Sequence, residues 1–197
     1  MKLLSIDIES TGLSQNDLII EFAMIPFDTD KRQIESSLQQ HFLIQCPSFD
    51  KLKSNLDPWV IEHNEKLIKK AHEEGIPLGE FKKRLEDCLN DKKLRDYFSL
   101  KKNEGMIIFG KSLNAIDLPF LIRDLGWNFM RKYFHYHVVD LTSVVYSLVD
   151  LRCLPVEVLS GSALAKHYGI GEVAHTALED AYNMALIYTK ILKQFRK

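Results

Sequence analysis

The sequence has few cysteines and no long apolar run. Its three cysteines, Cys46, Cys88 and Cys153, are far apart and odd in number, so they form neither a zinc-binding pattern nor a disulfide framework. No stretch approaches the roughly 18 apolar residues that a membrane-spanning helix requires. Acidic residues also interrupt the first apolar segment too early for a signal peptide. We therefore expect a chain without a membrane partner, in a reducing, cytoplasmic setting.

An excess of positive charge is also missing. The 197 residues include 26 Lys+Arg and 27 Asp+Glu, which gives a formal net charge of −1. Proteins that coat long duplexes usually carry a basic excess, because neutralisation of phosphates supplies most of their nonspecific affinity. The charge balance therefore predicts that any contact with nucleic acid is confined to a few terminal nucleotides, with metal ions supplying positive charge.

The order of apolar and charged segments predicts a single α/β domain over residues 1–197. Apolar segments predict strands at 2–9, 18–27, 33–46, 106–109 and 137–141, of which the first two form an antiparallel meander. Helices are expected at 117–126, 142–150, 160–168 and 177–195. This pattern indicates a mixed five-stranded sheet flanked by helices.

The segment at about 47–104 is expected to be a charged helical insertion between the third and fourth strands. Residues 51–104 contain 13 of the Lys+Arg residues and 11 of the Asp+Glu residues. Such a balance is typical of solvated helix faces and less often of a docking surface.

Two acidic residues interrupt the first predicted strand. Side chains alternate along a strand, so Asp7 and Glu9 share one face about 6.6 Å apart. Two carboxylates on a central strand repel each other and lose hydration, so they require a cation or protons. A partly solvated sheet face is the plain structural alternative. The sharp turn at Ser10–Leu13 includes Gly12, which would let the backbone of a ligand come close.

Asp117 follows the strand at 106–109 and begins a helix. It is therefore expected near the carboxyl edge of the sheet, where α/β folds usually place their sites. Pro119 is compatible with a first helical turn, which places the helix start between Asn114 and Asp117. Asn and Asp at such a position are also common as simple helix caps.

The segment from His175 to Asp180 is the most informative. Thr176 and Glu179 form a capping box, which identifies Thr176 as the expected N-cap. His175 and Asp180 then occupy the two positions whose side chains normally touch as an apolar staple. Asp180 heads an apolar column of the helix, so we expect it to face inward. A buried ion pair between the two side chains is the structural alternative.

Together these features predict an acidic site. Four clustered carboxylates cannot all stay ionised without cations, and oxygen-only ligands favour Mg²⁺ or Mn²⁺ over zinc. Two such ions about 3.5–4 Å apart can promote phosphodiester cleavage. A histidine, with an ordinary pKa near 6.5, suits the role of general base at neutral pH.

These residues resemble the three motifs of the DEDDh family of 3′→5′ exonucleases, which includes ribonuclease T, oligoribonuclease and the proofreading subunit of bacterial replicative polymerases. The resemblance extends over nearly the whole chain. The matching segments are Asp7-x-Glu9-x-Thr11-Gly12, Asn114-x-x-Asp117 and His175-x-Ala177-Leu178-x-Asp180. The first and third are specific, whereas the second is weak alone.

The resemblance implies a ribonuclease H-like fold and release of nucleoside 5′-monophosphates from the 3′ ends of single-stranded DNA or RNA. It also implies roles for nine residues. Two divalent cations, Mg²⁺ or Mn²⁺, would be held by Asp7, Glu9, Asp117 and Asp180, and His175 would activate the water. The substrate would be contacted by Thr11, Gly12, Leu13 and Asn114. Asp140 matches a frequent family aspartate with a supporting role at most.

The chain departs from the family at Leu113 and Ile116, where members often have a histidine and an aromatic residue. These departures leave the metal ligands intact but change the expected shape of the substrate pocket. A catalytically silent nucleic-acid-binding or adaptor module is the alternative function. A ribonuclease H-type endonuclease would share the fold and the metals but would give no role to His175. The sequence leaves open a homodimer, a polymerase-type partner and the choice between DNA and RNA.

Overall fold

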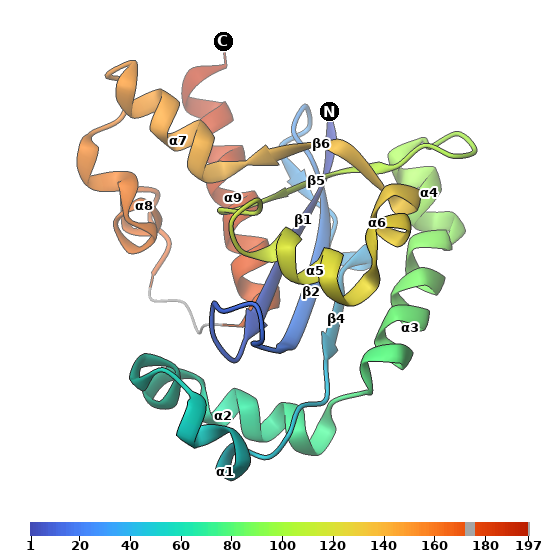
Figure 1. Cartoon of the computed structure of the whole chain (residues 1–197). Helices are drawn as coiled ribbons and strands as arrows, with labels where there is room; N and C mark the ends of the chain where they lie inside the picture. Colours follow the sequence, from blue (N-terminus) through green and yellow to red (C-terminus); the bar gives the residue numbers. More distant parts are fainter. Residues whose placement is uncertain (172–175, 197) are drawn as a thin grey trace.

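The computed structural model describes residues 1–171 and 176–196, and its centre is a mixed sheet (Figure 1). β1 (Lys2–Ser10) lies in the middle, antiparallel to β2 (Ile19–Asp28) and parallel to β5 (Met106–Gly110). β6 (Phe134–Asp140) continues the sheet in parallel beyond β5. On the other side, β2 pairs with β3 (Gln33–Ile34) and β4 (Gln40–Leu43), both antiparallel.

The sheet has six strands where the sequence predicted five. The expected single strand at 33–46 is divided by a short 3₁₀ turn, η1 (Ser36–Leu38), so that β3 and β4 pair separately with β2. The mixed α/β arrangement and the antiparallel meander at its start are confirmed.

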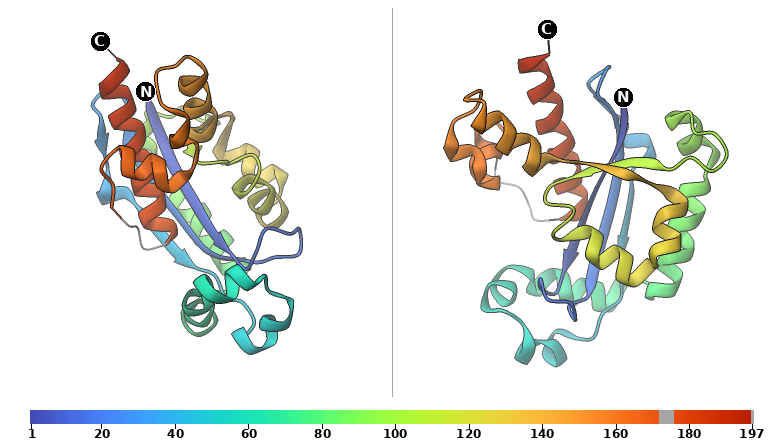
Figure 2. Two further views of the ribbon diagram at one scale, coloured as in Figure 1. Left: turned by 90° about the vertical axis from the view of Figure 1, so that its left-hand side faces the viewer. Right: turned by 45° about the horizontal axis from the view of Figure 1, so that its top comes forward.

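Alternation along β1 explains why both faces of the sheet are covered. Leu4, Ile6 and Ile8 point to one face and pack in a core with α3, α4, α5 and α6. Leu3 points to the other face, where the core is completed by α7, α8 and α9. Figure 2 shows α9 and the α5–α6 pair on opposite sides of the sheet. These helices are α3 (Leu78–Asn90), α4 (Lys92–Phe98), α5 (Asp117–Leu125), α6 (Trp127–Tyr133), α7 (Leu141–Asp150), α8 (Gly161–His167) and α9 (Ala177–Phe195).

The segment between β4 and β5 is mostly helical. It begins with α1 (Phe49–Leu52), a 3₁₀ turn η2 (Lys53–Asn55) and α2 (Pro58–Glu74). Asp57 caps α2 by accepting the N–H of Trp59 at 2.8 Å. Val60, Ile68 and Ala71 are buried against Ile20 of β2, so α2 is amphipathic and lies across the end of the sheet, near the turn that follows β1 (Figure 1).

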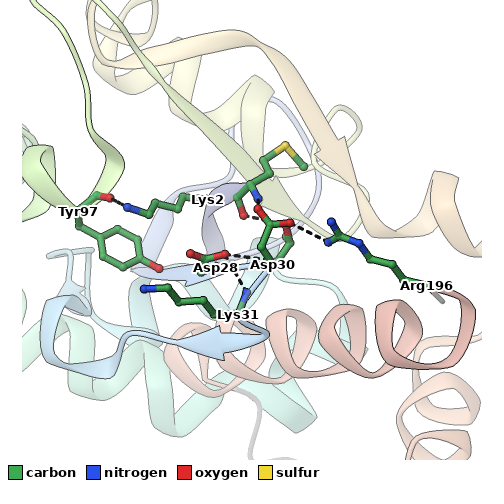
Figure 3. Close-up of polar contacts among 8 residues, drawn as sticks. Lys2, Asp28, Asp30, Lys31, Tyr97 and Arg196 are labelled. Carbon is green, nitrogen blue, oxygen red and sulfur yellow. Dashed lines mark hydrogen bonds and ion pairs between the residues drawn. The ribbon is translucent and has the colours of Figure 1, made fainter.

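Polar contacts tie the start of β1 to the end of α9 (Figure 3). The ammonium group of Met1 and the guanidinium of Arg196 both contact the carboxylate of Asp30, the latter at 2.8 Å. Lys2 donates to the carbonyl oxygen of Tyr97. These groups are largely exposed to solvent, which screens their charges, so the ion pairs contribute little to stability. Within the described residues, no helix has the length and apolar content needed to traverse a bilayer.

Candidate active site

The side chains of three acidic residues meet at the carboxyl end of β1. Asp7 and Glu9 point to the same face of β1 as Leu3, toward α9. Asp180 comes from the first turn of α9. Each of these carboxylates has an oxygen within 4.8 Å of the others, and all three are half-buried. Residues 7, 9 and 180 are therefore close enough to share a cation.

The capping of α9 fixes the direction of Asp180. Thr176 is the N-cap, as predicted, and its hydroxyl oxygen accepts the N–H of Glu179 at 3.3 Å. The N–H of Asp180 donates to the carbonyl oxygen of Thr176 at 2.9 Å. This bond closes the first helical turn, so the Asp180 side chain emerges on the sheet side of α9, near Asp7 and Glu9.

Asp117 lies beside this group of three. It is the first residue of α5 and only 3% exposed. Its Oδ1 accepts the backbone N–H of Ile8 at 3.1 Å, so the carboxylate is adjacent to the strand segment that carries Asp7 and Glu9. The structure thus places all four predicted ligands at one edge of the sheet, with Asp117 outside the tightest group.

Burial and mutual repulsion make these carboxylates hard to ionise. Burial, followed by the charges of Asp117 and Asp180, raises the pKa of Asp7 well above its usual range. Burial and the charge of Asp180 raise the pKa of Glu9 to about 7. Burial also raises the pKa of Asp117 to about 7, although the Ile8 N–H opposes this shift. A cation would relieve this repulsion.

The acids line a cavity of about 1240 Å³. This volume exceeds the roughly 300–1,000 Å³ of typical small-molecule sites. One wall comes from α2, including Asp57, Trp59 and Asn64, and another includes Lys111 and Lys166. The sequence analysis did not predict the contribution of α2, because the charge balance of this segment favoured a solvated surface. The available signal was Trp59, a large aromatic residue within a charged segment, which is 53% exposed in the structure.

Side-chain hydrogen bonds hold the turn after β1 in shape. The hydroxyl of Thr11 points into the turn, where it donates to Oδ1 of Asp17 at 3.1 Å and accepts the N–H of Leu18 at 2.9 Å. A Cβ atom at Gly12 would lie 2.5 Å from Oδ2 of Asp17. The backbone φ of Gly12 is +157°, which residues with a side chain rarely adopt, and bonds to Thr11 and Ser14 hold the Asp17 carboxylate in place, so the turn favours glycine. Gly12 and Leu13 line the cavity, and Leu13 is 76% exposed.

The remaining predicted residues have different positions. Asn114 is exposed in the turn before α5, and the N-cap of α5 is Ile116, whose side chain makes no capping bond. His175 lies outside the described residues. Asp140 caps α7 by accepting the N–H groups of Thr142 and Ser143. Its Oδ1 also accepts the N–H of Ser112 at 3.2 Å, which ties β6 to the turn that leads into α5.

A fifth acid, Glu21 of β2, was missed by the sequence analysis. It is 2% exposed and pairs with Glu9 across the two strands. Its negative charge contributes to the raised pKa values of Asp7 and Glu9. A single acid within the apolar run 18–27 was the available signal.

Neither a known family model nor a curated protein matches the sequence. Solved structures do match. Cell-death related nuclease 4 (CRN-4) superposes with a TM-score of 0.70 at 16% identity, covering 98% of this chain and 64% of CRN-4. The rAMP-bound nuclease domain of 3′hExo, a DEDDh family member, gives 0.63 at 14% identity, covering 98% and 92%. Pop2p from S. pombe in its Mg²⁺- and Mn²⁺-bound form gives 0.68 at 16%, covering 98% and 83%.

The chain therefore spans a little under two thirds of CRN-4 and nearly all of the 3′hExo nuclease domain. At such low identity the likeness establishes the fold, which is the ribonuclease H-like α/β fold of DEDDh-type 3′-exonucleases. The fold predicted from the sequence is confirmed.

Proposed function

We propose that this chain is a metal-dependent 3′→5′ exonuclease of the DEDDh type, forming one domain into which α1–α4 are inserted. The substrate would be single-stranded DNA or RNA, and the products nucleoside 5′-monophosphates. The observation that carries the proposal is the group of Asp7, Glu9 and Asp180, whose carboxylate oxygens lie within 4.8 Å of one another at the edge of a cavity. The fold, shared with nucleases, gives this group a chemical context.

The residues fit a pair of hard divalent cations. Their side chains offer only carboxylate oxygens, which suit Mg²⁺ and Mn²⁺. The raised pKa values of Asp7, Glu9 and Asp117 mean that these carboxylates resist full ionisation unless positive charge is supplied. Asp7, Glu9, Asp117 and Asp180 would hold the cations. When bound, the cations would lower the pKa of the attacking water and stabilise the departing oxygen. A structural neighbour, Pop2p, binds both ions.

The protein's own groups would handle the proton and the substrate. His175 would accept a proton from the water whose oxygen attacks phosphorus, while the bond from phosphorus to the 3′ oxygen of the preceding nucleotide breaks. Gly12 and Leu13, at the mouth of the cavity, would contact the terminal nucleotide. Thr11 would act indirectly by holding the turn in shape, because its hydroxyl is bonded within it.

The shape and charge of the cavity favour a short single strand. Its volume of about 1240 Å³ exceeds that of usual small-ligand sites. Trp59 is 53% exposed and its ring stacks on that of His63, so a base could extend this aromatic stack. Lys111 and Lys166 supply positive charge for a few phosphates within a chain of net charge −1. The free cysteines Cys46, Cys88 and Cys153 are consistent with the reducing, cytoplasmic setting proposed from the sequence.

The direct test is digestion of 5′-labelled single strands of DNA and RNA with Mg²⁺ or Mn²⁺. A ladder that shortens from the 3′ end, and that EDTA abolishes, is the expected result. Internal cuts would instead indicate an endonuclease. Binding without cleavage would indicate a silent nucleic-acid-binding module, and either outcome would refute the proposal.

A further inference from the structure

Glu21 is a buried acid at the edge of the proposed metal site. It lies on β2 directly opposite Glu9 of β1 and is 2% exposed. Because side chains alternate along a strand, Glu21 shares its face of β2 with Ala23 and Ile25, which pack against Ala177 and Ala181 of α9. Glu21 therefore faces the first turns of α9.

Both carboxylate oxygens of Glu21 already have partners. Oε2 accepts the backbone N–H of Ala177, the first residue of α9, at 2.9 Å. Oε1 contacts Nε2 of His41 from β4. The group of oxygens within 4.8 Å that could share a cation consists of Asp7, Glu9 and Asp180. Glu21 is thus placed to hold the helix rather than to bind the ion.

A second bond holds the same helix from β1. Ser5 is fully buried, and its hydroxyl donates to the carbonyl oxygen of Ala181 at 2.7 Å. Asp180 lies between the two attachment points, three residues after Ala177 and one before Ala181. The alanines at 177 and 181 are fully buried and small, so the helix approaches the sheet closely at this point. The position of Asp180 relative to Asp7 and Glu9 is therefore fixed from both sides.

We propose that Glu21 is a positioning residue, assisted by Ser5, which docks the start of α9 on the sheet and so places Asp180 for shared cation binding with Asp7 and Glu9. This inference rests on the proposed metal-dependent function. A carboxylate suits the role because the first N–H groups of a helix lack partners within the helix and carry partial positive charge. His41 provides a partner for the second oxygen of an otherwise buried acid.

Mn²⁺ affinity of the folded protein, measured by isothermal titration calorimetry, is the appropriate readout because it needs no substrate. Glu21→Ala removes the acceptor and should weaken Mn²⁺ binding by about 10–100-fold, the usual range for residues that orient metal ligands. Glu21→Gln keeps an oxygen that can accept the Ala177 N–H, and should stay within about fivefold of wild type.

Thr189→Val is a matched control on the same helix. Thr189 is 6% exposed, and its hydroxyl donates to the carbonyl oxygen of Leu186 at 2.8 Å. Its loss should lower the melting temperature while Mn²⁺ affinity stays at the wild-type value. A purely structural Glu21 would behave like this control.

Should Glu21→Ala fail to fold, Ser5→Ala removes the other bond that docks the same turn of α9 and adds no atoms to the buried contact. A loss of Mn²⁺ affinity is expected there too. Unchanged affinity in whichever of the two variants folds would overturn the inference, as would equal losses in Glu21→Ala and Glu21→Gln, which would indicate a role for charge alone. Absence of Mn²⁺ binding by the wild-type protein would refute the metal site itself, a result distinct from failure of the positioning role.

Discussion

Replacing Glu9 with glutamine should stabilise the metal-free protein at alkaline pH while removing a proposed metal ligand. Glutamine is nearly isosteric with glutamate but has no charge to bury or to repel Asp180 and Glu21. The variant therefore separates the destabilisation that the Glu9 charge causes in the folded protein from the contribution of Glu9 to cation binding. The contrast with the wild-type protein depends on pH, because only the wild-type residue titrates.

The magnitude follows from the pKa of Glu9, which burial and then Asp180 raise from 4.5 to about 7. The folded protein holds this proton more tightly than the unfolded chain, so the added stability is fully present below about pH 4.5 and is lost as the pH rises through about 7. The full difference in pKa corresponds to about 3 kcal/mol. Since the side chain is half-buried, solvent screening reduces the expected loss to about 2 kcal/mol.

Urea denaturation in EDTA, near pH 4.5 and near pH 8.5, measures this effect for both proteins. The unfolding free energy of wild type relative to Glu9→Gln should fall by about 2 kcal/mol between the two pH values. Saturating Mn²⁺ near pH 8.5 should restore the stability of wild type far more than that of the variant. Parallel pH profiles for the two proteins would show that the folded state does not disfavour the Glu9 carboxylate, and would refute the reasoning.

Four further outcomes are expected. Asp7→Ala should abolish metal-dependent cleavage without unfolding the protein, because it removes repulsion together with a ligand; a large fall in melting temperature would indicate a structural carboxylate instead. His175→Ala should be similarly inactive yet bind Mn²⁺ normally by calorimetry, and wild-type turnover would remove the histidine from the mechanism. Gly12→Ala should lower stability by about 1–2 kcal/mol, measured by urea denaturation, because alanine rarely adopts φ +157° and its Cβ would displace the Asp17 carboxylate from Thr11 and Ser14. Trp59→Ala should raise KM for single strands by about tenfold or more through lost base stacking, whereas a change confined to kcat would contradict that role.

Local sequence patterns predicted the strand that bears Asp7 and Glu9 and the start of α9. A period of two along β1 placed Asp7 and Glu9 on one face of a strand, and that strand is central in the sheet. The capping signal identified Thr176 as the N-cap of α9, which the structure confirms. These features depend on residues within a few positions of one another, and such short-range geometry can be derived from sequence.

Features that depend on distant partners were not predicted. Glu21 bonds to Ala177, which is 156 positions away, and no local pattern indicates that contact. The helix α6 (Trp127–Tyr133) was not predicted either, because its residues Phe129, Met130 and Tyr133 are buried through tertiary packing with α3 and α5.

Glu21 also bears on the meaning of the acidic cluster. Asp7, Glu9 and Asp117 each have a raised pKa, and Glu21 adds to the repulsion at the first two. For stability alone, neutral side chains of similar size would serve better at these positions, since no desolvation or repulsion would oppose folding. The two oxygens of Glu21 contact Ala177 and His41. Oxygens of Asp7, Glu9 and Asp180 lie within 4.8 Å of one another, and the three residues line a cavity. Glu21 thus holds α9 on the sheet, whereas Asp7, Glu9 and Asp180 converge. Cation binding requires such convergence, and docking of the helix alone does not.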